Sequence, residues 1–136
     1  MRPDVIEIHS KLTQSRRTKA TERFRDAARA VMMTSDVTAR GIDFPDVTLV
    51  VQIGAPSDRA QYIHRLGRTA RAGKSGEGVL VLAPEEDYFA RDDVRDLPLA
   101  KVTPNHGEDD AAAVAAAVRR VDDRTKAQHY LSLIHI

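Results

Sequence analysis

The stretch HRLGRTAR, at positions 64–71, places three arginines and one histidine close together in the chain. If the stretch is helical, His64 and Arg68 are four residues apart and share a face that Arg71 continues where the helix persists. The glycines at positions 67 and 73 favour a helix that ends near Arg68, with Arg71 on the following turn. In either case we predict that two guanidinium groups face one point, where they can hold phosphate oxygens through paired hydrogen bonds.

A solvated basic helix is the alternative for this stretch, and it is the commoner role of clustered arginines. The apolar residues Tyr62, Ile63 and Leu66 argue against it, because they predict that one side of the segment is held against a core. A guanidinium group keeps its charge and can offset the charge that develops during phosphoryl transfer. We therefore favour a phosphate-binding role.

Composition and charge narrow the class of protein. The chain has 136 residues, of which 42% are hydrophobic, and this fits a single domain with one core. It has no cysteine, which excludes disulfides, thiolate metal sites and a cysteine nucleophile. Its longest apolar run, residues 111–118, is too short to span a bilayer, and we expect no membrane partner.

Charge is distributed unevenly along the chain. Residues 1–74 carry 14 Lys and Arg against 8 Asp and Glu, whereas residues 75–136 carry 7 against 12. The basic half therefore predicts a surface that binds phosphates.

Strand and helix patterns alternate along the chain. Short apolar or alternating runs predict strands over residues 5–9, 29–34, 47–53 and 78–83. The apolar runs of the second and third predict parallel strands buried on both faces. Helices are predicted from a cap at Thr13 to about Ala27, from Ser57 or Asp58 through the arginine-rich stretch, and from Pro84. This alternation predicts an α/β fold, a three-layer sandwich with a mostly parallel sheet.

Polar side chains stand where two of these elements begin or end. Gln14 and Arg17 share the first turn of a predicted helix, whose free amides and positive dipole end favour an anion; an exposed helix start is the alternative. Ser35 and Asp36 follow the second strand, at the carboxyl end where open α/β sheets bind ligands. Asp43 is as well explained by an ordinary turn or cap as by ligand binding. Asp36 and Asp43 lack a third ligand at suitable spacing, so we predict no metal site.

Three of these segments resemble the motifs of one family. Residues 64–71 resemble motif VI of the DEAD-box RNA helicases, with Ala70 where most members have glycine. Residues 34–43, TSDVTARGID, resemble motif V, and residues 14–17, QSRR, resemble the Gln-x-x-Arg element that precedes it. The motifs occur in the family's order. The resemblance implies the second RecA-like domain of a two-domain, ATP-dependent RNA helicase that unwinds or remodels structured RNA.

The resemblance also implies a role for each candidate residue. Arg68 and Arg71 would act as arginine fingers on the terminal phosphates of ATP, supplied from the opposite domain. Asp43 would meet the ribose hydroxyls, with Gly41 beside it in the nucleotide site. Residues of the RNA-backbone site would be Gln14, Arg17, Ser35, which keeps the hydroxyl of the family threonine, and Asp36. His64 and Arg65 would face the other domain.

Two features of such helicases are absent from the sequence. It contains no Gly-x-x-x-x-Gly-Lys-Ser/Thr phosphate loop and no Asp-Glu-Ala-Asp sequence. Both are expected in a first RecA-like domain outside this chain, which would hold Mg²⁺ with the ATP. The strand that carries motif IV is also missing, so we expect an N-terminally truncated domain whose incomplete sheet has an aggregation-prone edge. The expected partners are RNA and the first domain, and we expect a monomer.

The carboxyl-terminal part has a different pattern. After a partial RecA-like domain over residues 1–97, prolines and a glycine predict a linker over residues 98–109. The alanine-rich residues 110–130 predict a helix with a narrow valine stripe. This helix is similar to the start of the helical extension in a fungal mitochondrial branch of RNA chaperones, and that branch implies a mitochondrial location. Residues 131–136 do not resemble the extension and are a possible artefact of truncation or cloning.

Two alternatives belong to other functional classes. The basic half could be a non-enzymatic RNA-binding platform, with steep salt dependence and no effect of nucleotide. The alanine-rich helix could instead recruit a partner, which would make the chain an interaction module. For the chain by itself we expect weak RNA binding without ATP hydrolysis.

Overall fold

In the part of the chain that the structure describes, the strands form two parallel pairs, and a helix packs against each pair. The computed structural model describes residues 3–36, 44, 47–71, 73–103 and 107–125. The chain divides into two compact units, Met1–Pro98 and Leu99–Ile136. The first unit contains β1 (Asp4–Ile8), α1 (Gln14–Asp26), β2 (Ala30–Thr34), β3 (Leu49–Ile53), α3 (Arg59–Leu66), β4 (Glu77–Val81), a 3₁₀ turn η1 (Pro84–Glu86) and a π-helical turn η2 (Phe89–Asp93).

The first strand pair joins β1 to β2, and α1 connects the two strands and packs against both. Side chains alternate along a strand, and Ile6 and Ile8 are the residues of β1 that are buried. Phe24 of α1 meets Phe44 edge to face, with 5.0 Å between the ring centroids. As predicted, Thr13 is the N-cap of α1, and its hydroxyl accepts the backbone N–H of Arg16 at 3.4 Å.

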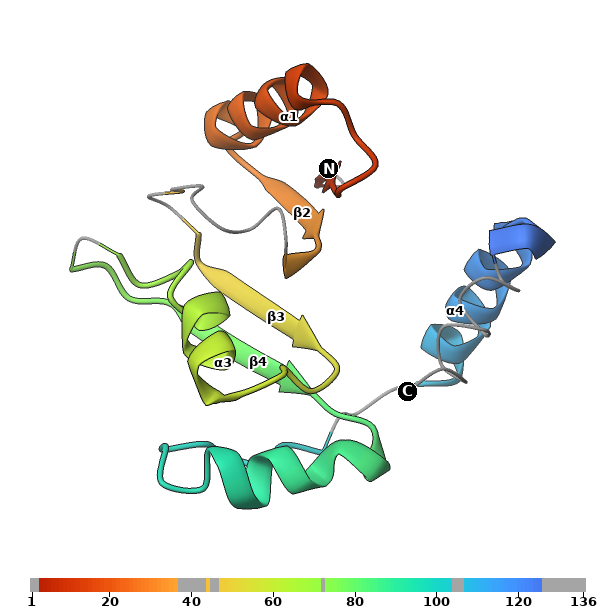
Figure 1. The fold of residues 1–136 in the computed structure, drawn as a ribbon. Coiled ribbons are helices and arrows are strands. Elements are labelled where there is room, and N and C mark those ends of the chain that lie inside the picture. Colours follow the sequence, from red (N-terminus) through yellow and green to blue (C-terminus); the bar gives the residue numbers. More distant parts are fainter. Residues whose placement is uncertain (1–2, 37–43, 45–46, 72, 104–106, 126–136) are drawn as a thin grey trace. The chain divides into compact units, whose positions relative to one another are not determined.

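The second strand pair joins β3 to β4 in parallel, with α3 lying beside β3 (Figure 1). Its core contains Tyr62 of α3, Phe89 of η2 and Val94, all buried. The rings of Tyr62 and Phe89 meet edge to face, with 6.0 Å between their centroids. Four partly buried residues complete this cluster: Ala55, Leu66, Leu80 and Leu97. The core therefore holds α3, which carries the start of the arginine-rich stretch, against β3 and β4.

Two carboxylates tie together segments around this second strand pair. Glu86 accepts the backbone N–H of Ala55 at 2.9 Å and that of Ala83 at 2.8 Å, which ties the loop after β3 to the loop after β4. These two hydrogen bonds hold the pKa of Glu86 below its ordinary value. Asp96 forms a bidentate ion pair with Arg59, the first residue of α3, through N–O distances of 2.5 and 2.8 Å.

The prediction that the strands are buried on both faces is wrong. In β2, Val31 is 44% exposed and Met33 is 57% exposed, and in β3 Val51 is 51% exposed. The described helices cover one face of each strand pair, so the apolar runs are buried on alternate residues only. The α/β fold with parallel strands is confirmed. The helix predicted from Pro84 is present as the two short turns η1 and η2.

The second unit contains one long helix, α4 (Glu108–Arg120). The helix predicted over residues 110–130 is interrupted, because Val121 has an extended backbone with ψ of 132°. The carboxylate of Asp122 accepts the backbone N–H of Thr125 at 2.9 Å and its hydroxyl at 2.7 Å, which starts a new turn instead. Residues 126–136 lie outside the described part. Across the described residues, every helix is too short or too polar to cross a bilayer.

Candidate functional site

The arginine-rich stretch begins on α3, a helix with clear caps at both ends. The carboxylate of Asp58 accepts the backbone N–H of Gln61 at 2.7 Å, and this hydrogen bond, with a second from the Ser57 hydroxyl, lowers the pKa of Asp58. At the other end, Gly67 is the C-cap and its N–H donates to the carbonyl of Ile63 at 2.8 Å. The caps place the end of the helix one turn before Arg71.

The core contacts predicted for α3 are confirmed in part. Tyr62 is buried and Leu66 packs against the same cluster, whereas Ile63 is 45% exposed, so its predicted core position is wrong. Ile63 follows Tyr62 directly, and consecutive residues of a helix point in directions about 100° apart. A helix orientation that places Tyr62 in the core therefore points Ile63 away from it.

The turn after α3 is held by Thr69, which sequence reasoning did not select. Thr69 is 5% exposed, and its hydroxyl donates to the backbone carbonyl of Val47, at the start of the β3 segment. The backbone of Gly76 lies so close that a Cβ there would be 2.0 Å from the Thr69 hydroxyl oxygen. Ala70, the next residue, has a φ of 55°, in the left-handed region. The family glycine at this position is therefore explained by the backbone conformation.

Arg68 and Arg71 are both half-buried and lie on either side of this turn. The Nε of Arg68 donates to the carbonyl of His64 at 3.1 Å, and the Nε of Arg71 donates to the carbonyl of Gly67 at 2.7 Å. Each side chain thus bonds the backbone four residues earlier. A neutral carbonyl orients a guanidinium group without cancelling its charge. That the two groups converge on one ligand stays a prediction.

Arg65 and Asp36 form a bidentate ion pair. The Nε of Arg65 lies 2.5 Å from Oδ1 of Asp36, and Nη2 lies 2.5 Å from Oδ2. The side chains are 21% and 36% exposed, respectively. This pair joins α3 to the carboxyl end of β2, where Ser35 is exposed. Among the described residues, it brings two of the candidate side chains into direct contact.

Gln14 and Arg17 lie in the first turn of α1, as predicted. Gln14 is exposed and Arg17 is half-buried, and no acidic residue lies in that turn. The Nε of Arg17 is buried with no hydrogen-bond partner in the protein, so it is a donor that an acceptor from a ligand or solvent could satisfy once the side chain moves. Gly41 and Asp43 lie outside the described residues. No group of three or more His, Cys, Asp or Glu that could bind a metal occurs in the part of the chain that is described.

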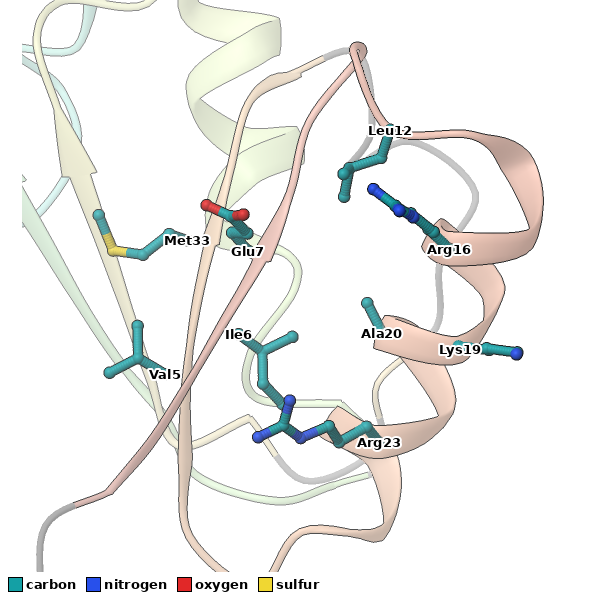
Figure 2. Close-up of a pocket in the computed structure, with 9 residues that line it drawn as sticks. All are labelled: Val5, Ile6, Glu7, Leu12, Arg16, Lys19, Ala20, Arg23 and Met33. Carbon is teal, nitrogen blue, oxygen red and sulfur yellow. The ribbon is translucent and has the colours of Figure 1, made fainter.

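A pocket of about 650 Å³ lies beside β1 and α1 (Figure 2). Ile6, Leu12 and Ala20 line it between the strand and the helix, whereas Val5 and Met33 lie on the other side of the strand. Three cations of α1 also line it, namely Arg16, Lys19 and Arg23, and Arg23 forms an ion pair with Asp4 at 2.6 Å. These three cations are three and four positions apart in the sequence, a spacing that places them on one face of a helix. That spacing was the sequence signal for this pocket. None of the predicted site residues that the structure describes lines it.

Residues 3–73 match the family described as the helicase conserved C-terminal domain. This match contains the Gln14–Arg17 pair, the Asp36 carboxylate and the arginine-rich stretch. The chain belongs to this helicase family.

The helicase domain is similar to several DEAD-box proteins. It is 49% identical over 127 residues to "DEAD-box ATP-dependent RNA helicase 25" of Oryza sativa subsp. japonica, a match covering 93% of the chain and 21% of that relative. It is 60% identical over 98 residues to the protein of the same name from Arabidopsis thaliana, covering 72% of the chain and 17% of the relative. The chain therefore spans about a fifth of the length of these relatives.

Solved structures agree with the fold. The helicase domain matches "DEAD-box helicase Mss116 bound to ssRNA and UDP-BeF" with a TM-score of 0.85 and 36% identity, over 98% of this chain and 27% of that chain. It matches "Mss116p DEAD-box helicase domain 2 bound to an RNA duplex" with a TM-score of 0.82 and 36% identity, over 98% of this chain and 53% of that chain. The predicted RecA-like second domain is confirmed.

Proposed function

We propose that this helicase domain works in an ATP-dependent RNA helicase that remodels structured RNA. The observation that carries the proposal is the arginine-rich stretch, which is fixed at the end of a capped helix with Arg68 and Arg71 on a tightly held turn. The relatives support the same function, since their names describe ATP-dependent RNA helicases. A first RecA-like domain is the proposed partner, and we propose that the complete protein acts as a monomer.

The catalytic role that we propose for Arg68 and Arg71 is to bind the terminal phosphates of ATP. Guanidinium groups suit that ligand because they keep their charge and present several donors in a fixed plane. ATP supplies the phosphoryl group that is transferred to water. Arg68 and Arg71 would donate hydrogen bonds to its oxygens and offset their charge, a role worth about 10³–10⁵ in turnover in related phosphoryl-transfer enzymes. We place Asp43 and Gly41 at the sugar, and Mg²⁺ in the partner domain.

The RNA site that we propose combines the first turn of α1 with the carboxyl end of β2. Gln14, Arg17 and Ser35 offer an amide, a guanidinium group and a hydroxyl, which suit phosphate and sugar oxygens and not base edges. The buried, unsatisfied Nε of Arg17 supports the assignment. RNA strands would thus be held by their backbone, without preference for sequence.

Membership of the fungal mitochondrial branch and a mitochondrial location both stay proposals. The curated relatives described above are plant proteins and do not support the predicted fungal branch. The proposal of a mitochondrial location rests only on the residues that resemble that branch. Localisation of a fluorescent fusion of the full-length protein would test it, and a signal outside mitochondria would contradict it.

Arginine substitutions in the full-length protein test the catalytic proposal. We expect Arg68→Ala or Arg71→Ala to reduce RNA-stimulated ATP hydrolysis at least about 10³-fold, with little change in RNA affinity. Arg91→Ala is the control, because Arg91 is an exposed arginine whose contact is an i,i+4 ion pair with Asp87 at 3.5 Å. Near-normal turnover in both finger variants would contradict the assignment.

RNA binding without catalysis is the second candidate for this chain alone. The structure titled "Mss116p DEAD-box helicase domain 2 bound to an RNA duplex" favours it, since that neighbour is a second domain in complex with RNA. We expect the chain to bind duplex RNA with an affinity that falls steeply with salt and does not respond to ATP. Fluorescence anisotropy across a salt series measures this, and a flat salt dependence would exclude backbone binding.

A further inference from the structure

The ion pair between Asp36 and Arg65 joins two residues that were predicted to contact other molecules. Both oxygens of the Asp36 carboxylate accept from the Arg65 guanidinium, at 2.5 Å each. Arg65 is 21% exposed, so the pair is partly shielded from water and holds a defined geometry. A carboxylate and a guanidinium group that satisfy each other in this way are poor direct ligands for RNA or for a second domain.

Each end of the ion pair is attached to a different part of the proposed site. Asp36 directly follows Ser35, at the carboxyl end of β2, where the RNA backbone is proposed to bind. On the other side, the backbone carbonyl of Arg65 accepts the N–H of Arg68 at 3.2 Å. The side chain of Arg68 is in turn bonded to the carbonyl of His64, the residue before Arg65. A continuous series of contacts therefore leads from the end of β2 to Arg68.

We infer that Asp36 and Arg65 are positioning residues that couple RNA binding at β2 to the placement of Arg68. The inference rests on the proposed function and deepens it. A bidentate pair fixes distance and angle together, so a shift of the end of β2 on RNA binding moves the last turn of α3 with it. Breaking the pair uncouples the two sites and leaves each of them intact.

A double-mutant cycle in the full-length protein tests the coupling. Asp36→Asn removes one charge with little change of shape, and Arg65→Gln removes the opposite charge with a shorter polar side chain. We expect each to lower the kcat of RNA-stimulated ATP hydrolysis about tenfold, in the range of measured coupling between sites. The KM for RNA should change less than about twofold, and the double variant should also lose about tenfold, since both changes break one interaction.

The chain offers a matched control on the same helix. Arg59 and Asp96 form an equally bidentate pair at the start of α3, before the arginine-rich stretch begins. Asp96→Asn should lower the melting temperature no more than Asp36→Asn does, because its ion pair is the more exposed of the two, and should leave kcat with RNA unchanged. An equal loss of kcat in Asp96→Asn would overturn the inference, because the effect would then be general destabilisation.

Two further results would also overturn it. A raised KM for RNA with normal kcat in Asp36→Asn would show direct RNA binding, and a hundredfold loss in the double variant, about the product of the single losses, would show independent roles. Failure of the proposed function can be distinguished from failure of this inference. A wild-type protein without RNA-stimulated ATP hydrolysis, or an Arg68→Ala variant with normal hydrolysis, would refute the proposed function before the double-mutant cycle is interpreted.

Discussion

Replacing Ala70 with glycine is expected to stabilise the helicase domain. The φ of Ala70 is 55°, and an L-residue in this left-handed region is disfavoured by roughly 1–2 kcal/mol. Glycine has no such penalty, but it gives the unfolded chain more freedom, which opposes the gain by roughly 0.5–1 kcal/mol. The side chain of Ala70 is exposed, so losing its methyl group removes little buried area. The net expectation is a gain of about 0.5–1 kcal/mol, or a few degrees in melting temperature.

Urea unfolding of the chain followed by circular dichroism measures this difference. The matched control is Ala60→Gly, because Ala60 is an exposed alanine in α3 with helical backbone and should lose up to about 1 kcal/mol. The two substitutions remove the same methyl group, so their opposite signs isolate the backbone conformation. The reasoning is refuted if Ala70→Gly destabilises the chain as much as Ala60→Gly does.

Substitutions at three other positions probe the contacts around the same turn and the loops after β3 and β4. Thr69→Val should destabilise the domain by about 1–3 kcal/mol in urea unfolding, because the partly buried carbonyl of Val47 loses its donor, whereas Thr69→Ser should lose less. Gly76→Ala should lower the unfolding free energy by about 1–3 kcal/mol, since its Cβ would meet the Thr69 hydroxyl oxygen at 2.0 Å. The pKa of Glu86 is lowered by folding from an ordinary value of 4.5, so its contribution is present above pH 4.5 and is lost as the pH falls through the lower folded pKa. The stability gap between wild type and Glu86→Gln, measured from pH 7 to 3, should therefore close at the acid end.

The parts of the fold that depend on neighbours in sequence could be predicted. Apolar runs and turn residues located each strand to within a few residues, because a strand needs little more than its own pattern and its ends. The cap at Thr13 was predicted correctly, and Asp58 was one of two candidates for the cap of α3. Burial on both faces could not be predicted from the runs alone, since it depends on which helices cover which face.

The contacts that organise the site join residues far apart in sequence. Asp36 and Arg65 are separated by 29 positions, and Thr69 reaches a carbonyl 22 positions earlier. The residues next to Asp36 or Thr69 in the sequence do not indicate which distant residue it contacts. An aspartate after a strand and a threonine between arginines can each play many structural roles. The positive φ of Ala70 was equally hidden, since alanine itself favours a right-handed backbone. The family glycine at that position was the one clue.

The arginine-rich stretch divides its charged residues between two tasks. Arg65 faces a carboxylate, which cancels its charge and uses it to hold α3 on β2. Arg68 and Arg71 each carry a guanidinium group, and a bond from its Nε to a backbone carbonyl sets the direction of each side chain. A phosphate site needs both properties, because charge without a fixed position is weakened by solvent and by side-chain entropy. Fixed position comes from the buried Thr69 hydroxyl and from the Arg65 ion pair. We therefore predict that loss of either weakens ATP hydrolysis by the full-length protein without removing any group that is proposed to touch the phosphates.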